Sequence, residues 1–213
     1  AMSRIFGAGG LNDAFYFAFM IPNLFRRLFG EGALSAAFLP VYARLRETDE
    51  HGARALASLL VASLAIGLGV LTIIGEVVLW ALMETTGIDS LALRLAMLML
   101  PYMPLVCLVA ILGAVLQVRG RFGPTAAAPI IANLCVIGGS AGLWLLFFRT
   151  ETGAEDGEAL ATRLTHIHFV AGAVLLAGVL QLAWSLWALR GEAWWTSSMG
   201  SARAHLGGVL RQA

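Results

Sequence analysis

Long apolar stretches dominate the chain. A helix needs about 20 mostly apolar residues to cross a hydrocarbon layer ~30 Å thick. Residues 56–83, 91–118, 125–148 and 165–189 meet this length with few charges. A fifth stretch, residues 13–43, is apolar at both ends and polar in the middle. The pattern predicts an all-α, polytopic transmembrane helix bundle with five spans, because barrel strands would be shorter and alternate in polarity.

Polar segments separate the predicted spans. Residues 44–54, 84–90, 119–124 and 149–163 contain most of the charges and are expected to be loops or turns. Within the span 91–118, Pro101 and Pro104 predict a kink. Arginines concentrate on alternate loops, and loops rich in arginine face the cytoplasm. The cytoplasmic set is Arg44, Arg46, Arg54, Arg119, Arg121, Arg190, Arg203 and Arg211, against Arg4, Arg94, Arg149 and Arg163 on the other side.

Both ends of the chain resemble parts of further helices. Residues 1–7 are expected to be the tail of a preceding helix, and residues 204–213 the start of another. The N-terminus has no basic region followed by an apolar stretch and a cleavage site, so a signal peptide is not predicted. We therefore expect this sequence to be one piece of a longer transporter.

Composition supports a membrane protein and excludes several other classes. Hydrophobic residues make up 59% and charged residues 13% of the 213 residues, whereas soluble domains carry about 25% charged residues. The net charge of +1 does not favour nucleic-acid binding, which uses a basic surface. Cys107 and Cys135 lie inside apolar runs and are expected to be packing residues. No spacing typical of a metal or cofactor site is present, so none is predicted.

Polar residues gather in the middle of the stretch 13–43. At 100° per residue, Asn23, Arg26, Arg27 and Glu31 fall within an arc of about 140° on one helix face. Charges at membrane depth are costly, so this face should line a bundle interior or a wet cavity. An internal Arg27–Glu31 pair could lock two helices together. The second arginine favours a different use, binding of an anionic ligand such as a phosphate.

Two glycines, Gly30 and Gly32, bracket Glu31. Glycine destabilises the middle of a helix by about 1 kcal/mol relative to alanine. It could permit a local break, as in the interrupted helices of transporters, or close packing of two helices. The sequence leaves both interpretations open.

Several motifs carry a family resemblance. They are Arg4-Ile-Phe-Gly-Ala-Gly9, Asp13-Ala-Phe15, the run Ile21-Pro-Asn-Leu-Phe-Arg-Arg-Leu-Phe-Gly-Glu-Gly32, Pro101-Tyr102, and Gly113 to Asn133 with its Arg-Gly-Arg-Phe-Gly-Pro124 turn. With them the chain resembles the MurJ (MviN) lipid II flippases of the MOP exporter superfamily. The resemblance extends over essentially the whole chain.

The resemblance implies a fold and a function. It implies the N-terminal lobe of a two-lobed MOP-type transporter in the bacterial inner membrane. Such proteins move lipid II, the undecaprenyl-linked peptidoglycan precursor, from the cytoplasmic to the periplasmic leaflet, without a cofactor. The family's substrate-binding positions fall on Asp13, Asn23, Arg26, Arg27 and Glu31, and Arg26 is expected to meet the pyrophosphate. The family's first helix and its C-terminal lobe, a partner of this lobe, would lie outside residues 1–213.

Other functions are compatible with parts of the pattern. Another MOP transporter, either a polysaccharide-lipid flippase or a multidrug antiporter, would share the fold. An antiporter would favour a membrane carboxylate over the arginine pair Arg26 and Arg27. A membrane enzyme acting on lipid-linked sugars would need acid–base residues in a cytoplasmic loop, where residues 44–54 offer only scattered charges. We therefore expect a transporter and not an enzyme.

Overall fold

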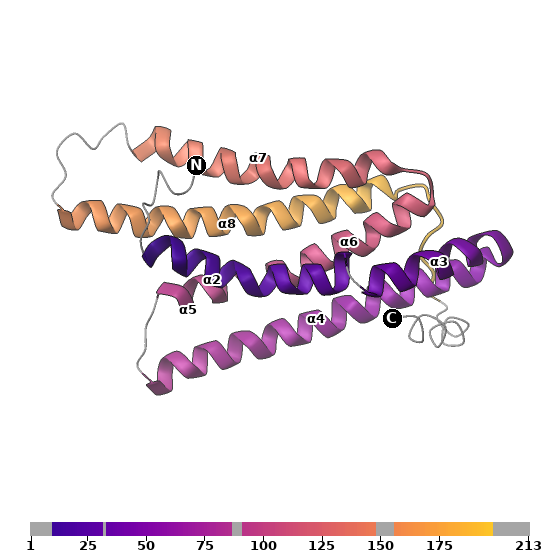
Figure 1. Ribbon diagram of the computed structural model, residues 1–213, viewed down its shortest axis with the longest axis horizontal. Helices are drawn as coiled ribbons and strands as arrows, with labels where there is room; N and C mark the ends of the chain where they lie inside the picture. Colours follow the sequence, from indigo (N-terminus) through magenta and orange to yellow (C-terminus); the bar gives the residue numbers. More distant parts are fainter. Residues whose placement is uncertain (1–9, 32, 87–90, 148–155, 198–213) are drawn as a thin grey trace.

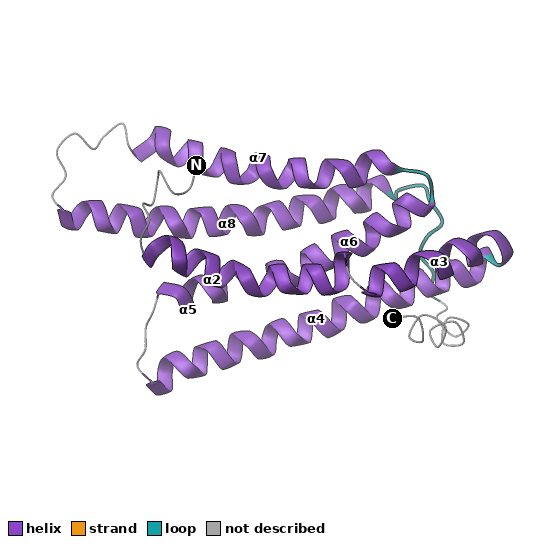
Figure 2. Ribbon diagram, viewed as in Figure 1, coloured by secondary structure: helices purple, strands orange, loops and turns teal. Residues whose placement is uncertain are grey.

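The computed structural model describes residues 10–31, 33–86, 91–147 and 156–197, and almost all of them are helical. The helices run side by side along the long axis of the molecule (Figure 1), and no strand occurs among these residues (Figure 2). This confirms the all-α bundle. The elements are α2 (Gly10–Phe25), η1 (Arg26–Glu31), α3 (Ala33–Thr48), α4 (Glu50–Thr86), α5 (Leu91–Met99), α6 (Tyr102–Val118), α7 (Phe122–Phe147) and α8 (Asp156–Ala188).

Among the described residues, four helical segments are long and apolar enough to cross a membrane. They are Glu50–Thr86, Leu91–Val118, Phe122–Gly142 and His166–Ala188, which overlap the four clean stretches of the sequence. The stretch 13–43 forms α2, η1 and α3 instead of one continuous α-helix. The predicted helix ends at 1–7 and 204–213 lie outside the described residues.

The predicted loop 44–54 is wrong, because almost all of it is helical. The helix α3 continues to Thr48, and α4 begins at Glu50, so Asp49 alone separates them. The Asp49 side chain accepts a hydrogen bond of 3.0 Å from the Gly52 backbone N–H, as an N-cap residue does. The charged residues therefore form a tight helical corner and cap α4.

The predicted link 149–163 is also partly helical. The helix α8 begins at Asp156, within the acidic segment, while residues 148–155 lie outside the described part. Acidic residues stabilise the first turn of a helix because they complement its dipole. Acidic composition thus marked a helix start at this point.

The centre of the bundle is α6, which packs against α2, α3, α4, α7 and α8. Of the most apolar 18-residue stretch in Leu91–Val118, 61% is buried inside the bundle. The corresponding share in Phe122–Gly142 is 6%. The segment is interrupted at Leu100 and Pro101, between α5 and α6, where the sequence predicts a kink. Exposed apolar side chains cover the outer faces, as expected of surfaces against lipid, for example Ile66, Val70, Ile73, Ile137 and Leu180.

The helices α7 and α8 form an antiparallel hairpin. A Cβ built on Gly139 would lie 2.9 Å from the Ala173 side chain, so the two backbones approach closely there. Further along, the Trp184 indole donates a hydrogen bond of 3.2 Å to the Pro124 carbonyl. Small residues and side-chain hydrogen bonds are how helices associate within a membrane.

Candidate functional site

The polar middle of the stretch 13–43 coincides with a break in the helix. After Phe25 the chain forms the π-helical turn η1, and α3 begins at Ala33. The Ser35 hydroxyl donates a hydrogen bond of 3.2 Å to the Phe29 carbonyl, which supplies a partner to a carbonyl within this turn. Wide turns of this kind are rare and often occur at functional sites. Gly30 lies within this wide turn, whereas Gly32 lies outside the described residues. The choice between a local break and close helix packing at these glycines stays open.

A cavity of about 500 Å³ lies beside this break. Its walls come from α2, η1, α6, α7 and α8, which lie next to one another in the bundle. One wall is apolar and is made mainly by α6, including Tyr102, Val106 and Val109. The polar side chains that border the cavity are Asn23, Arg26, Gln117, Thr125, Asn133, Gln181 and Ser185.

Arg26 is the cationic side chain on this cavity. It is half-buried, and its Nε donates a hydrogen bond of 3.2 Å to the Asn23 amide oxygen. The turn η1 packs against α6, and Arg26 borders the cavity together with Tyr102 and Val106 of that helix. A guanidinium held beside a cavity is suited to binding a phosphate or carboxylate.

Asp13 and Arg27 occupy a different face of the same segment. Both are exposed and neither borders the cavity. The helix α2 is exposed along the same side at Tyr16, Phe17 and Met20. Consecutive residues point about 100° apart around a helix axis, so a cavity that faces Arg26 need not reach Arg27. The expected arc did not include Asp13, which was expected from the resemblance alone. A substrate-binding role for Asp13 and Arg27 stays a prediction.

Glu31 is described only in its backbone. It ends the turn η1, while its side chain lies outside the described part of the structure. The alternative of an Arg27–Glu31 pair, and a role for Glu31 in binding, therefore also stay predictions.

Sequence reasoning missed the neutral polar residues of the cavity. Gln117, Thr125, Asn133 and Gln181 each stand in a largely apolar sequence and were not singled out. One signal was available, since Gln181 and Ser185 lie four residues apart and therefore share a helix face. The Thr125 hydroxyl lies 3.4 Å from the Gly113 carbonyl oxygen, which connects α7 to α6 near the cavity.

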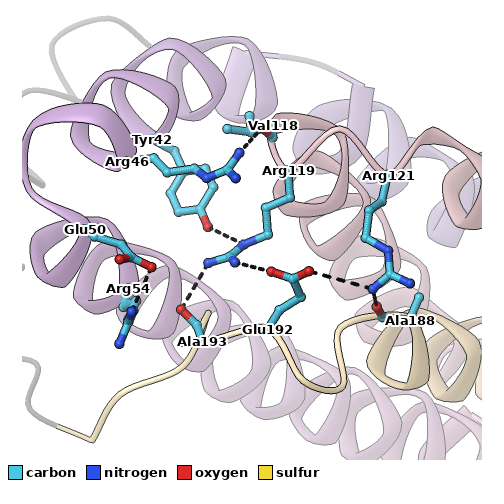
Figure 3. A network of polar contacts seen from close by, with 10 residues as sticks. All are labelled: Tyr42, Arg46, Glu50, Arg54, Val118, Arg119, Arg121, Ala188, Glu192 and Ala193. Atoms are coloured by element: carbon cyan, nitrogen blue, oxygen red, sulfur yellow. Dashed lines mark hydrogen bonds and ion pairs between the residues drawn. The ribbon is translucent and has the colours of Figure 1, made fainter.

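A second polar cluster closes the end of the bundle near Gln117. We name it the arginine clamp and define it as Tyr42, Arg119, Arg121 and Glu192 (Figure 3). Arg119 donates hydrogen bonds of 2.6 Å to the Glu192 carboxylate, 3.0 Å to the Ala193 carbonyl and 3.3 Å to the Tyr42 hydroxyl. The clamp thus joins α3, the turn between α6 and α7, and the segment after α8.

Further contacts strengthen the clamp. Arg121 donates a hydrogen bond to the Ala188 carbonyl and lies 4.0 Å from the Glu192 carboxylate. Only 6% of the Arg119 side chain is exposed. Burial alone would lower the pKa of Arg119, but the contacts to Tyr42 and Glu192 raise it above its usual value. The clamp is therefore a charged contact that holds helices together.

The described residues contain no group of three or more His, Cys, Asp or Glu side chains that could hold a metal ion. The chemistry available at the cavity is therefore that of one guanidinium and several amide and hydroxyl groups. These groups bind anions and polar, uncharged groups by hydrogen bonding. The arrangement suits a binding site for a phosphate attached to a polar molecule.

Comparison with known proteins relates this chain to one family. The family model "Lipid II flippase MurJ" matches residues 2–212. A probable lipid II flippase MurJ of Rhizobium tropici is 35% identical over 192 residues, which are 85% of this chain and 34% of the relative. The lipid II flippase MurJ of Burkholderia cenocepacia is 36% identical over 145 residues, 64% of this chain and 28% of the relative. A probable lipid II flippase MurJ of Bdellovibrio bacteriovorus is 34% identical over 182 residues, 80% and 32% of the two chains.

The match covers most of this chain but only part of each relative. The matched residues span 28–34% of the length of these three relatives. The family model nonetheless includes all the predicted spans and every residue of the cavity. The chain is a multi-pass membrane protein segment and belongs to the MurJ lipid II flippase family.

Proposed function

We propose that this chain is the part of a lipid II flippase that binds the pyrophosphate of the lipid-linked peptidoglycan precursor. The observation that carries the proposal is Arg26 bordering a cavity of about 500 Å³ at the break between α2 and α3. A guanidinium matches phosphate oxygens in geometry and charge. Family membership supplies the class of substrate.

The physical problem for a flippase is the polar head of its substrate. A sugar-peptide carried through hydrocarbon would expose many unsatisfied polar groups, each costing several kcal/mol. A cavity lined by hydrogen-bonding side chains replaces the lost water. Alternating access then opens the cavity to one leaflet at a time, by rocking of one lobe against the other.

We place the protein in the bacterial inner membrane, with the arginine clamp at the cytoplasmic end. The arginine bias of the loops supports this orientation. The two arginines of the clamp, Arg119 and Arg121, belong to the predicted cytoplasmic set. Translocation changes no covalent bond, so the protein acts as a transporter and not as an enzyme. Its partners are lipid II and the remaining lobe of the transporter.

The proposal is tested in the full-length protein, supplied as the sole copy. Arg26→Ala should abolish complementation at normal membrane levels, and Arg26→Lys should restore it only partly, because an ammonium cannot form the two-pronged contact. The matched control is Arg44→Ala, since Arg44 is exposed and lies outside the cavity. Normal growth with Arg26→Ala would refute the proposed role of Arg26.

A further inference from the structure

Gln181 of α8 has a buried polar side chain on the cavity. The residue is 6% exposed, and its Nε2 donates a hydrogen bond of 2.7 Å to the Ala128 carbonyl of α7. A carbonyl oxygen only accepts hydrogen bonds, so the amide nitrogen must face Ala128. This contact fixes the orientation of the amide and leaves Oε1 as the atom for any other interaction.

The Oε1 atom of Gln181 is buried and has no hydrogen-bond partner among the described residues. An amide oxygen can accept two hydrogen bonds, and native proteins rarely leave such an atom buried and unused. Gln181 borders the same cavity as Arg26. A donor that arrives with a ligand would satisfy this oxygen.

Gln181 and Arg26 lie at similar depth in the bundle. Thr125 of α7 contacts Gly113 of α6, and Ala128, the partner of Gln181, lies about one helical turn further along α7. Since α7 runs back along α6, this brings Gln181 to the level of Ala110, which also borders the cavity. Arg26 borders this cavity together with Val106 and Val109, which lie within about one turn of Ala110 along α6.

We propose that Gln181 is a substrate-binding residue that recognises the uncharged group next to the phosphate. Its amide oxygen accepts a hydrogen bond from a sugar hydroxyl or amide N–H, while Arg26 pairs with the phosphate oxygens. The inference rests on the proposed function and deepens it. It assigns to this lobe a preference for a sugar-bearing pyrophosphate lipid over the same lipid without its sugar.

The test measures the affinity of the purified full-length protein for two probes, undecaprenyl pyrophosphate with and without an attached sugar. Gln181→Leu should weaken binding of the sugar-bearing probe about tenfold, as expected for one buried hydrogen bond, and leave the sugar-free probe unchanged. Arg26→Ala should weaken binding of both probes. Thr72→Val is the matched control, because Thr72 is buried, bonds to the Leu68 carbonyl and lies off the cavity, so it should weaken neither.

Each outcome decides one proposal. If Gln181→Leu weakens the binding of both probes equally, or of neither, the proposed role of Gln181 is overturned. Its amide oxygen then holds a buried water or serves packing alone. Failure of Arg26→Ala to weaken either probe overturns the proposed phosphate site and leaves the Gln181 result standing. If Gln181→Leu does not fold, the affinities of the protein without substitution are compared for the two probes. Equal affinities also overturn the proposed preference for the sugar-bearing lipid.

Discussion

Two arginines of this bundle have opposite surroundings. Arg119 is enclosed by protein, with only 6% of its side chain exposed and with hydrogen bonds to Glu192, Ala193 and Tyr42. Arg26 is half-buried, donates to the neutral amide of Asn23 and borders a cavity of about 500 Å³. Both belong to a chain in which every charge is costly to bury.

The difference teaches how to separate structural from functional arginines in a membrane protein. An arginine that joins helices sits among acceptors contributed by several elements, as Arg119 does with α3 and the segment after α8. An arginine that binds a ligand needs empty space beside its guanidinium. The number of charges along the sequence does not distinguish the two cases, but the volume next to each side chain does.

The largest expected effect is on stability and comes from the enclosed arginine. Arg119→Met should lower the free energy of unfolding by about 3 kcal/mol, because it leaves Glu192 facing a buried apolar group. The measurement is the unfolding midpoint of the purified protein, together with its level in the membrane. Arg26→Met should change the midpoint far less, and equal losses would abolish the contrast between the two arginines.

A smaller effect is expected where helices approach beside the cavity. A Cβ built on Gly178 would lie 2.7 Å from a ring carbon of Tyr102, which borders the cavity. Gly178→Ala should destabilise the protein by about 1–2 kcal/mol and weaken substrate binding by moving the ring. Gly172→Ala on the same helix has no atom within 4 Å of the new Cβ and should be neutral or slightly stabilising. Similar behaviour of the two variants in the unfolding measurement would contradict the close approach.

The orientation of Arg26 can be tested through its neighbour. Asn23→Ala removes the acceptor of the 3.2 Å hydrogen bond and should cost about 1 kcal/mol, seen as a several-fold loss of substrate affinity. In a double-mutant cycle, Asn23→Ala should have little further effect once Arg26 is alanine. Fully additive losses would mean that Asn23 does not act through Arg26.

The smallest effect is expected at the exposed ion pair of Glu50 and Arg54. The pair is 2.7 Å long, with 55% of the Glu50 side chain exposed, and exposed pairs contribute little because water screens them. Glu50→Gln should leave the unfolding midpoint unchanged, whereas Glu192→Gln should lower it. A comparable fall in both variants would show that enclosure is not what makes the clamp stabilising.

The sequence was sufficient for the helical class of the fold. Long apolar runs determine membrane helices because the bilayer requires them, and residues 91–118 and 125–148 overlap helices of the structure. Hydropathy failed at helix ends. It assigned the charged residues around Asp49 and after Asp156 to loops, although acidic residues there begin α4 and α8.

The candidate site was predictable only in part. Asn23 and Arg26 border the cavity, as expected of a polar face inside a bundle. Asp13 and Arg27 are exposed and do not border the cavity. Asp13 was expected from the resemblance alone, and Arg27 points about 100° away from its neighbour Arg26 around the helix axis. For Gln181 the one sequence signal was the helix face that it shares with Ser185. Its hydrogen bond to the Ala128 carbonyl of α7 depends on how two helices pack, which the sequence pattern does not reveal.

The π-helical turn Arg26–Glu31 also determines where this wall of the cavity can bend. A continuous α-helix resists bending because its regular backbone hydrogen bonds must first be disrupted. At Arg26–Glu31 the π-helical turn already interrupts the α-helical pattern of hydrogen bonds. The attraction between Arg26 and a bound anion would act where α2 and α3 meet, and not at the middle of one continuous helix. The residue that would bind the anion, Arg26, thus lies in the same turn at which this wall of the cavity can bend.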